Sequence, residues 1–288
     1  MGGGNVSLMG ASLAGSKYLI RNYRPWETPR ELPRTVLALV WFFLCTFSTS
    51  LVNVHLDRTN PFLLPPLGHR LRLPDPLLDT FNPGYLRAQI PPDLPDTLVH
   101  IAPAIMLFRV VIGGKQSCWI FRQLGYIVGT AYLIRLIFVS MTILPNSNVN
   151  CLFHVGPSLL SDAVLVMLQM KQTCGDVVFS GHTIMFMSAS LVWINNPLKN
   201  IDPNINRIIN FITITFSFTG IISLVASAYH YTLDCVLSIL TMSFMWTFYH
   251  YLVRQPHLDH TAISRLVNYI DGYRHHKQPP PPDNTDMV

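Results

Sequence analysis

Charged residues are scarce in this sequence. Only 12% of its 288 residues are Asp, Glu, Lys or Arg, whereas about a quarter of a typical soluble domain is charged. Half of the chain is hydrophobic and the mean hydropathy is +0.33. So little charge in so apolar a chain excludes an ordinary soluble domain and predicts an all-α integral membrane protein with several spans.

The signals of several other protein classes are also missing. Neither an HExxH motif nor paired CxxC motifs occur, so the sequence predicts no metal site and no cofactor. The opening MGGGNVSLMGASLAG lacks the basic stretch and apolar core of a cleavable signal peptide. We therefore expect the first apolar run itself to direct insertion into the membrane.

Six apolar runs approach the ~20 residues that a helix needs to cross a bilayer. They cover residues 35–54, 98–112, 124–144, 177–194, 208–229 and 231–253. The second run is short and contains Arg109. The last two runs meet at His230, which predicts a tight turn there with the His at a membrane surface. The predicted organisation is an N-terminal segment 1–34, a six-helix catalytic domain 35–253 and a largely disordered tail 254–288.

The distribution of Lys and Arg predicts the orientation. If both termini are cytosolic, the inner segments hold 13 of these residues and the outer loops hold 5. Because basic residues concentrate on the cytosolic side, this split predicts cytosolic termini. The net charge of +5 then follows from topology, and a nucleic-acid partner is not needed to explain it.

Two His residues are predicted at the outer surface. His182 stands near the start of the fourth run, and His230 and Asp234 stand where the fifth and sixth runs meet. Residues four apart share a helix face, so the Asp234 carboxylate can hold one nitrogen of the His230 ring. A His held in this way is a nucleophile or base, and a second His can protonate a leaving oxygen. The pattern favours phosphoryl or acyl transfer over its alternatives, a helix-packing role or a zinc site.

The motifs around these residues resemble those of the sphingomyelin synthase family, within the wider lipid phosphate phosphatase superfamily. The stretch CGDVVFSGHT (174–183) resembles the family's third motif, and HYTLD (230–234) opens its fourth, which closes at Tyr249 and His250. The second motif is matched by Arg122 and by YLIRLIFVSMT (132–142), although Gln replaces the second Arg of the family's pair. For the first motif, RLPDPLLD (72–79) and PPDLPD (91–96) are rival candidates.

The resemblance implies a phosphotransferase with a catalytic triad of His182, His230 and Asp234. Phosphocholine, or phosphoethanolamine, would pass from a glycerophospholipid lying between the two His to the primary hydroxyl of ceramide, releasing diacylglycerol. His230 would carry the phosphoryl group, and His182 would serve as acid and then as base. Contacts with the substrate are expected from four further residues: Tyr132, Arg135, Asp176 and Ser180. For Arg135 a tie between helices is an equal alternative, and Asp176 is alternatively a helix cap.

The implied partners are a phospholipid donor, ceramide and membrane lipid, with a homo-oligomer left open. The resemblance implies a multi-pass protein of the Golgi membrane, with the plasma membrane or endoplasmic reticulum as alternatives, and a lumenal or exoplasmic site. A lipid phosphate phosphatase or phospholipase C-like hydrolase is the first alternative function. It is disfavoured because Leu224 stands where the phosphatases carry an Arg six residues before the His. A non-catalytic lipid-binding relative is the second, and the intact triad disfavours it.

The outer loop between the third and fourth runs contains two Cys residues, Cys151 and Cys174. An oxidising lumen would allow them to form a disulfide. Asp162 lies in the same loop, where we expect it to be solvated.

Overall fold

The computed structural model describes residues 31–63, 72–81, 91, 94–149, 151, 154–175, 178–199, 201–254 and 261–271. Within these ranges the structure is helical and contains no strand, which confirms the predicted all-α class. The helices are α2 (Glu31–Thr59), α3 (Pro76–Phe81), α5 (Leu94–Val111), α6 (Ser117–Met141), α7 (Leu159–Met167), α8 (Gly181–Asn195), α9 (Pro203–Ala226), α10 (Thr232–Arg254) and α11 (Ala262–Asp271).

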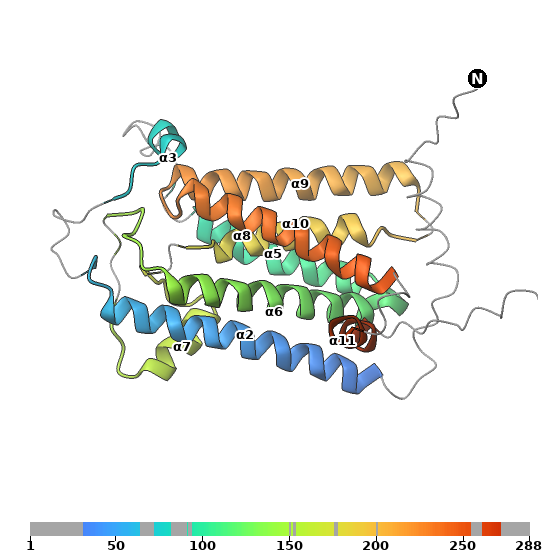
Figure 1. Ribbon diagram of the computed structural model, residues 1–288. Helices are drawn as coiled ribbons and strands as arrows, with labels where there is room; N and C mark the ends of the chain where they lie inside the picture. The colour runs from blue at the N-terminus through green and yellow to red at the C-terminus, as the bar shows by residue number, and fades with distance from the viewer. Residues whose placement is uncertain are drawn as a thin grey trace, which may run out of the picture.

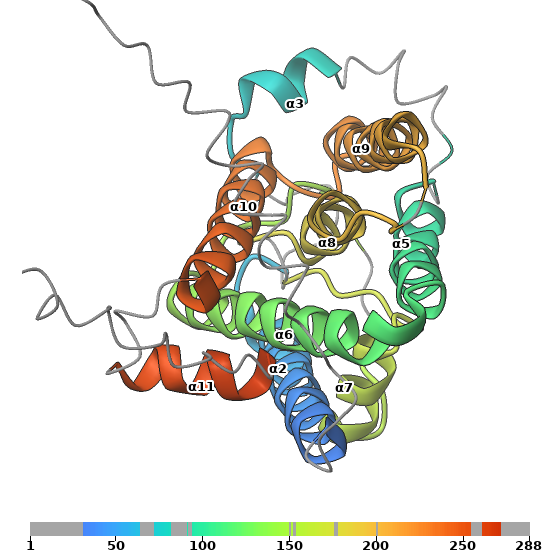
Figure 2. The same cartoon turned by 90° about the vertical axis from the view of Figure 1, so that its right-hand side faces the viewer.

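The longer helices form a bundle around α8. Helices α2, α5, α6, α8, α9 and α10 run along one axis in Figure 1, and the chain reverses at each end. Seen along this axis in Figure 2, α8 is enclosed by α5, α6, α9 and α10, all of which contact it. Helix α2 packs on the outer side of α6. The core of the bundle is therefore built around a helix that the others surround.

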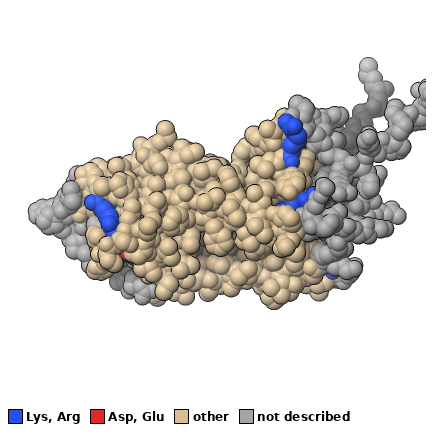
Figure 3. Space-filling view, turned by 90° about the horizontal axis from the view of Figure 1, so that it is seen from below, with Lys and Arg blue, Asp and Glu red and all other residues tan. Residues whose placement is uncertain are grey.

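The outer surface of the bundle is apolar along its middle. Helix α9, for example, exposes Phe211, Ile212 and Phe218 on its outer face. In the view of Figure 3 the Lys and Arg side chains lie near the two ends, and the band between them is free of charge. Large apolar surface of this kind is unfavourable in water and favourable in hydrocarbon. The surface thus fits a bundle that spans a bilayer.

Five of the described helices are long and apolar enough to cross a membrane: α2, α5, α6, α9 and α10. The predicted run 177–194 corresponds to α8, which has only 15 residues. At 1.5 Å per residue it is about 22 Å long, short of the ~30 Å hydrocarbon core. Phe186, Ala189 and Val192 on α8 are fully buried. The structure therefore does not confirm α8 as a sixth span, although this helix runs along the bundle axis with the other five (Figure 1).

The two ends of the bundle hold different parts of the chain. The start of α2, the end of α10 and all of α11 lie at one end in Figure 1, on the right. The starts of α5, α8 and α10 lie at the other end, on the left, together with α3 and α7. The predicted site residues belong to this second end, which we call the site end.

Candidate active site

A tight turn at the site end presents His230. Just beyond the end of α9, Ala228 adopts the left-handed region at φ 57°. The backbone N–H of Tyr229 donates to Leu224 O (2.9 Å), and that of Ala228 donates to Val225 O (3.0 Å). This pair of bonds defines a Schellman motif, which closes a helix within two residues. His230 follows at once, so the predicted tight turn is confirmed.

A second strained residue precedes His182. Phe179 has φ 72°, a conformation that costs a non-glycine residue about 1 kcal/mol or more. Its carbonyl accepts a hydrogen bond from Arg135 Nε (2.7 Å), which helps to hold this conformation. Ser180 then caps α8 by accepting from the backbone N–H of Thr183 (3.2 Å). His182 therefore lies in the first turn of α8, whose start is held by the Arg135 hydrogen bond to Phe179 and by the Ser180 cap.

The first turn of α10 holds Asp234 in place. Asp234 Oδ2 accepts from the backbone N–H of Tyr231 (3.1 Å), in the manner of a capping box. Asp75, in the loop before α3, accepts from the Thr232 backbone N–H (2.6 Å) and hydroxyl (2.9 Å). Burial raises the pKa of Asp75, but the hydrogen bonds from Thr232 and Leu78 outweigh it and leave that pKa below its usual value. A charged carboxylate thus caps the helix that carries Asp234.

The structure brings the three predicted triad residues together. His230 Nδ1 lies 3.7 Å from Asp234 Oδ2, and His230 Nε2 lies 3.4 Å from His182 Nδ1. The His230 side chain is only 3% exposed, whereas that of His182 is 26% exposed. Asp234 therefore faces one nitrogen of His230, and the other nitrogen faces the second His.

A fourth residue, Asp96 on α5, completes the row. Asp96 Oδ1 lies 3.4 Å from His182 Nε2, and Asp96 Oδ2 accepts from the hydroxyl of Tyr229 (2.9 Å) and from the Gln172 amide. Each His thus faces its own carboxylate through one nitrogen and the other His through the second. Asp96 closes PPDLPD, one of the two candidates for the first motif. Spacing alone did not indicate that it lies beside His182, because residues 96 and 182 are on different helices.

The site opens into a cavity of about 800 Å³. His182, His230 and Asp96 line it together with Tyr132 and Arg135 of α6. Its wall continues along α2 and along the segment that follows α7. A cavity of this size is within the range of small-molecule sites in proteins.

The four predicted substrate contacts differ in their positions. Tyr132 and Arg135 line the cavity, and Arg135 Cζ lies 5.7 Å from the Tyr132 ring centre. Arg135 also ties α6 to the backbone before α8, so the predicted helix tie is present. Ser180 is fully buried as the cap of α8. Asp176 lies outside the described residues.

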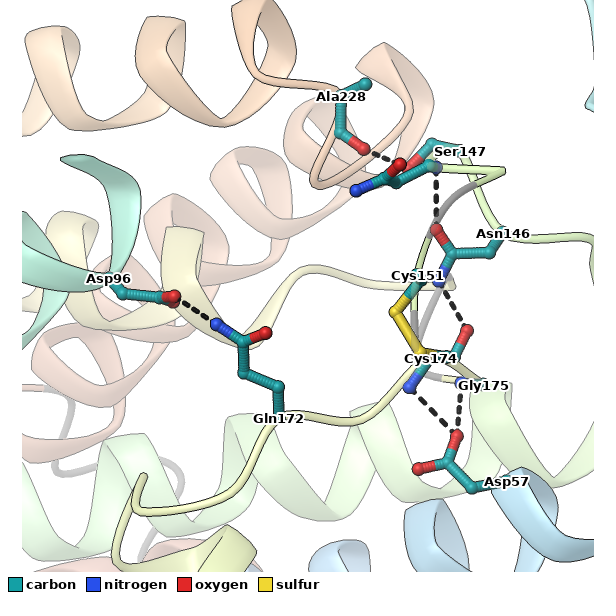
Figure 4. Close-up of a disulfide and its surroundings, with 10 residues drawn as sticks. Asp57, Asp96, Asn146, Ser147, Cys151, Gln172, Cys174, Gly175 and Ala228 are labelled. Carbon is teal, nitrogen blue, oxygen red and sulfur yellow. Dashed lines mark hydrogen bonds between the residues drawn. A yellow bond between two sulfur atoms is a disulfide. The ribbon is translucent and has the colours of Figure 1, made fainter. Parts of the chain in front are cut away.

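The disulfide that the sequence allowed but did not decide is present. Cys151 and Cys174 are bonded, with their Cα atoms 5.9 Å apart. Figure 4 shows that Asp57, near the end of α2, accepts from the backbone N–H groups of Cys174 (2.9 Å) and Gly175 (2.5 Å). The segment from Cys151 to Gly175 is thereby fastened at its base, close to the start of α8.

Asp162 is not solvated, contrary to our expectation from the loop sequence. It is buried and forms ion pairs with Lys171 (2.7 Å) and Arg58 (2.9 Å), and it accepts from the Gly156 backbone N–H. The Lys171 ammonium, with Arg58, lowers the pKa of Asp162 to about 2 despite the opposing effect of burial. A side chain at Gly156 would overlap the carboxylate, so glycine is required there. Sequence spacing does not reveal this cluster, because Arg58 comes from α2.

Comparisons with known proteins agree with the motifs. A family model described as PAP2 superfamily C-terminal matches residues 173–251, which contain His182, His230 and Asp234. Phosphatidylcholine:ceramide cholinephosphotransferase 1 of Rattus norvegicus is 27% identical over 265 residues, covering 86% of this chain and 59% of the rat protein. The Homo sapiens protein of the same name is 26% identical, with 86% and 60% covered.

A further relative, sphingomyelin synthase-related protein 1 of Mus musculus, is 23% identical over 276 residues, covering 88% of this chain and 53% of the mouse protein. The chain thus spans somewhat more than half the length of these curated relatives. The chain is therefore similar to the sphingomyelin synthases over most of its length, as its motifs predict, and its residues 173–251 match the model of the PAP2 superfamily C-terminal region.

Proposed function

We propose that this protein is a ceramide phosphotransferase. It moves phosphocholine, or alternatively phosphoethanolamine, from a glycerophospholipid to the primary hydroxyl of ceramide and releases diacylglycerol. The observation that carries the proposal is the row Asp234, His230, His182, Asp96 at the wall of the 800 Å³ cavity. The similarity to proteins named phosphatidylcholine:ceramide cholinephosphotransferase supports the choice of substrates.

In the first half of the reaction, His230 Nε2 attacks phosphorus. Asp234 lies 3.7 Å from Nδ1, and in our proposal it closes to a hydrogen bond that keeps the proton on that nitrogen and leaves the Nε2 lone pair available. The bond between phosphorus and the diacylglycerol oxygen breaks, and His182 donates its proton to that oxygen. The product is a phosphocholine group on His230 and free diacylglycerol.

In the second half, ceramide takes the place of diacylglycerol. His182 removes the proton from the primary hydroxyl of ceramide, whose oxygen attacks phosphorus as the bond to His230 breaks. Asp96 faces the other nitrogen of His182 and stabilises its protonated state. The same His therefore serves first as acid and then as base, and the pair returns to its starting protonation.

The two rings must separate to admit the phosphate. An in-line displacement places the attacking and leaving atoms on opposite sides of phosphorus, yet the two facing nitrogens lie only 3.4 Å apart. This distance excludes the simplest form of our prediction, a phosphate held between the rings as they lie here. His182 is the ring that moves in our proposal, because it is the more exposed of the two.

Arg135 and Tyr132 complete the phosphate site. The Arg135 guanidinium lies within the cavity wall, and its side chain is held through Nε by Phe179 O. An arginine fixed in this way offers preorganised charge to phosphate oxygens. Asp176 and Ser180 stay predicted contacts of the lipid headgroup.

The site faces a lumenal or exoplasmic compartment in this proposal. The Cys151–Cys174 disulfide lies at the site end, and disulfides persist in oxidising compartments. The charge distribution along the sequence independently favours a cytosolic position for the opposite end, where α2 starts and α10 ends. Among such membranes, the resemblance favours the Golgi.

The phosphatase alternative is less well supported. Leu224 occupies the position of the phosphatase arginine, and its side chain is fully buried in the core. It is not part of the cavity lining. A phosphomonoester, which carries one more negative charge than a diester, would lack that cation here.

The test is transfer by the purified protein in lipid vesicles. Labelled phosphatidylcholine or phosphatidylethanolamine, supplied with ceramide, should give a labelled phosphosphingolipid and one equivalent of diacylglycerol. Rapid release of inorganic phosphate from phosphatidic acid, without a ceramide product, would instead favour the phosphatase. No turnover of any of these lipids by correctly folded protein would favour a lipid-binding relative.

A further inference from the structure

Helix α2 carries a polar face that the proposed reaction does not use. Thr46, Ser50 and Asn53 are spaced at positions i, i+4 and i+7, so they lie on one side of the helix. All three are buried and line the cavity, and Phe42 and Phe43 line it one turn further along the helix. A row of polar side chains in a membrane helix usually serves a partner within the bundle or a ligand.

Asn53 lacks a partner for its buried oxygen. Its side chain is 2% exposed, and within the described part of the chain Oδ1 accepts no hydrogen bond. The neighbouring threonines differ, because Thr46 donates to Phe42 O (2.8 Å) and Thr49 donates to Tyr132 O (3.0 Å). An unpaired buried amide destabilises a protein. In the wall of a cavity, it indicates a ligand that supplies the missing hydrogen bond.

The position of Asn53 along α2 relates it to the segment that precedes α8. Asp57, one turn further along α2, binds the backbone of Cys174 and Gly175. Asn53 therefore lies about 6 Å along the helix axis from the level at which the segment before α8 is anchored. Arg135 and His182 line the same cavity. A lipid whose hydroxyl meets His182 would place the next few atoms of its backbone along this wall.

We propose that Asn53 binds the amide of the sphingolipid acceptor and distinguishes ceramide from diacylglycerol. This inference rests on the proposed function. Ceramide carries a secondary amide on the carbon next to the reacting CH₂OH group, so its N–H donor must lie close to the reacting oxygen. Phosphatidylcholine and diacylglycerol carry esters there, which lack an N–H donor. A carboxamide pairs with an amide as both donor and acceptor, and Ser50 adds a hydroxyl one turn away.

The experiment compares two lipids and two variants. Asn53→Leu keeps the volume of the side chain and removes its polar atoms. His55→Leu is the matched control, because His55 lies on the exposed outer face of the same helix. Each protein is assayed with phosphatidylcholine and either ceramide or N-methylceramide, which lacks the amide N–H. Formation of the phospho-enzyme without an acceptor is measured in parallel.

Wild type and His55→Leu should favour ceramide over N-methylceramide by about 10- to 100-fold in kcat/KM, the scale of a lost buried hydrogen bond. Asn53→Leu should lose a similar factor with ceramide and lose most of the discrimination, while phospho-enzyme formation stays within about twofold. Equal discrimination in wild type and Asn53→Leu would overturn the role of Asn53. Absence of transfer to ceramide by wild type would instead overturn the proposed function.

If Asn53→Leu fails to fold, Asn53→Ser provides the same comparison with a smaller polar group. Thermal unfolding in detergent, without lipid, identifies such a failure. A loss of phospho-enzyme formation in a folded variant would place Asn53 in the donor site and contradict the proposal.

Discussion

The two ends of the bundle bury the same kinds of side chain and use them differently. At the site end, His182 and Asp96 are each about one-quarter exposed, 26% and 22%, and both face the cavity. At the opposite end, the side chains bond to one another. His250 is hydrogen-bonded to Gln123 (3.0 Å), and Asp271 accepts from Trp119 (2.6 Å) and Tyr249 (2.7 Å).

This difference separates the residues of the proposed catalytic site from the residues that hold the helices together. Polar groups in a membrane domain are stable when they pair with each other, and such pairs hold helices together. At the opposite end, the pairs join α6 to α10 and dock α11 onto both. Groups that face a cavity keep part of their bonding capacity for a ligand. Residue type alone therefore does not identify the site. What identifies it is whether a polar side chain bonds to a neighbouring helix or faces the cavity.

Two of the motifs contain residues from both ends of the bundle. Arg122 and Arg135 belong to one motif on α6, but 13 residues separate them, which is about 20 Å along a helix. Arg122 donates to the backbone carbonyl of Asp271, whereas Arg135 lines the cavity. Tyr249 and His250 close the fourth motif, yet they lie far from His230, which opens it. Each motif thus combines residues of the site with residues that fasten the opposite end.

The largest expected effect comes from comparing two His→Asn substitutions, one at each end of the bundle. His230→Asn should reduce transfer by about 10³-fold or more and abolish the phospho-enzyme, because it removes the nucleophile that we propose. His250→Asn should leave kcat within a few-fold and lower the thermal stability instead, because it disturbs the bond to Gln123. Labelling with phosphatidylcholine in the absence of ceramide, followed by mapping of the label, measures the first effect.

That comparison fails if His250→Asn abolishes transfer in a folded protein. Label on His182 in the wild type would likewise reverse the proposed roles of the two site histidines.

An intermediate effect is expected from the two Asp residues of the rival first motifs. Asp96→Asn should lower kcat/KM by about 10- to 100-fold, which corresponds to roughly 1.5–3 kcal/mol for a hydrogen bond to a charged group. Its thermal stability should change little, because the amide oxygen still accepts from Tyr229. Asp75→Asn should mainly lower stability, because Asp75 caps α10 with both oxygens. Kinetics and thermal unfolding of the two variants, measured side by side, separate the two roles.

The opposite pattern would show that Asp75 acts in the site. Equal losses of activity and stability in both variants would remove the distinction between the two motifs.

Much of the site was predictable from the sequence, because its elements are local. The spacing of His230 and Asp234 depends only on helix geometry, and the tight turn follows from two apolar runs that meet without a loop. The disulfide required only two Cys residues in one loop. The six helical runs were found where they were expected, although α8, at 15 residues, is shorter than a full span requires. Its apolar residues face other helices, and hydropathy does not distinguish helix neighbours from lipid.

The rest of the site depends on contacts between helices that are distant in sequence. Asp96 reaches His182 from α5, and Asp162 is buried only because Arg58 of α2 supplies a counter-charge. Asn53 gave no signal at all, because a single Asn in an apolar run does not reveal whether it faces lipid, another helix or a cavity. Such pairings become visible only when the packing of the helices is known.

The smallest expected effect comes from replacing Asp271, at the end of the bundle opposite the site end. Burial raises the pKa of Asp271, although Tyr249 and Trp119 donate hydrogen bonds that favour its charged form. A raised pKa means that the folded state binds this proton more tightly than the unfolded state does. Docking of α11 should therefore be strongest at low pH and weaken as the pH rises through this pKa.

Asp271→Asn should be nearly neutral in stability and should remove this pH dependence. The amide oxygen still accepts from Tyr249 and Trp119, and the side chain at position 271 then carries no charge at any pH. Asp271→Ala removes the acceptor of the Trp119 and Tyr249 hydrogen bonds and should cost about 1–3 kcal/mol. Thermal unfolding in detergent across pH, with Trp fluorescence as the signal, measures both variants, and transfer activity at 25 °C should stay within about twofold. If Asp271→Asn reduced transfer as strongly as Asp96→Asn, the two ends would be coupled, and the separation of catalysis from fastening would not hold.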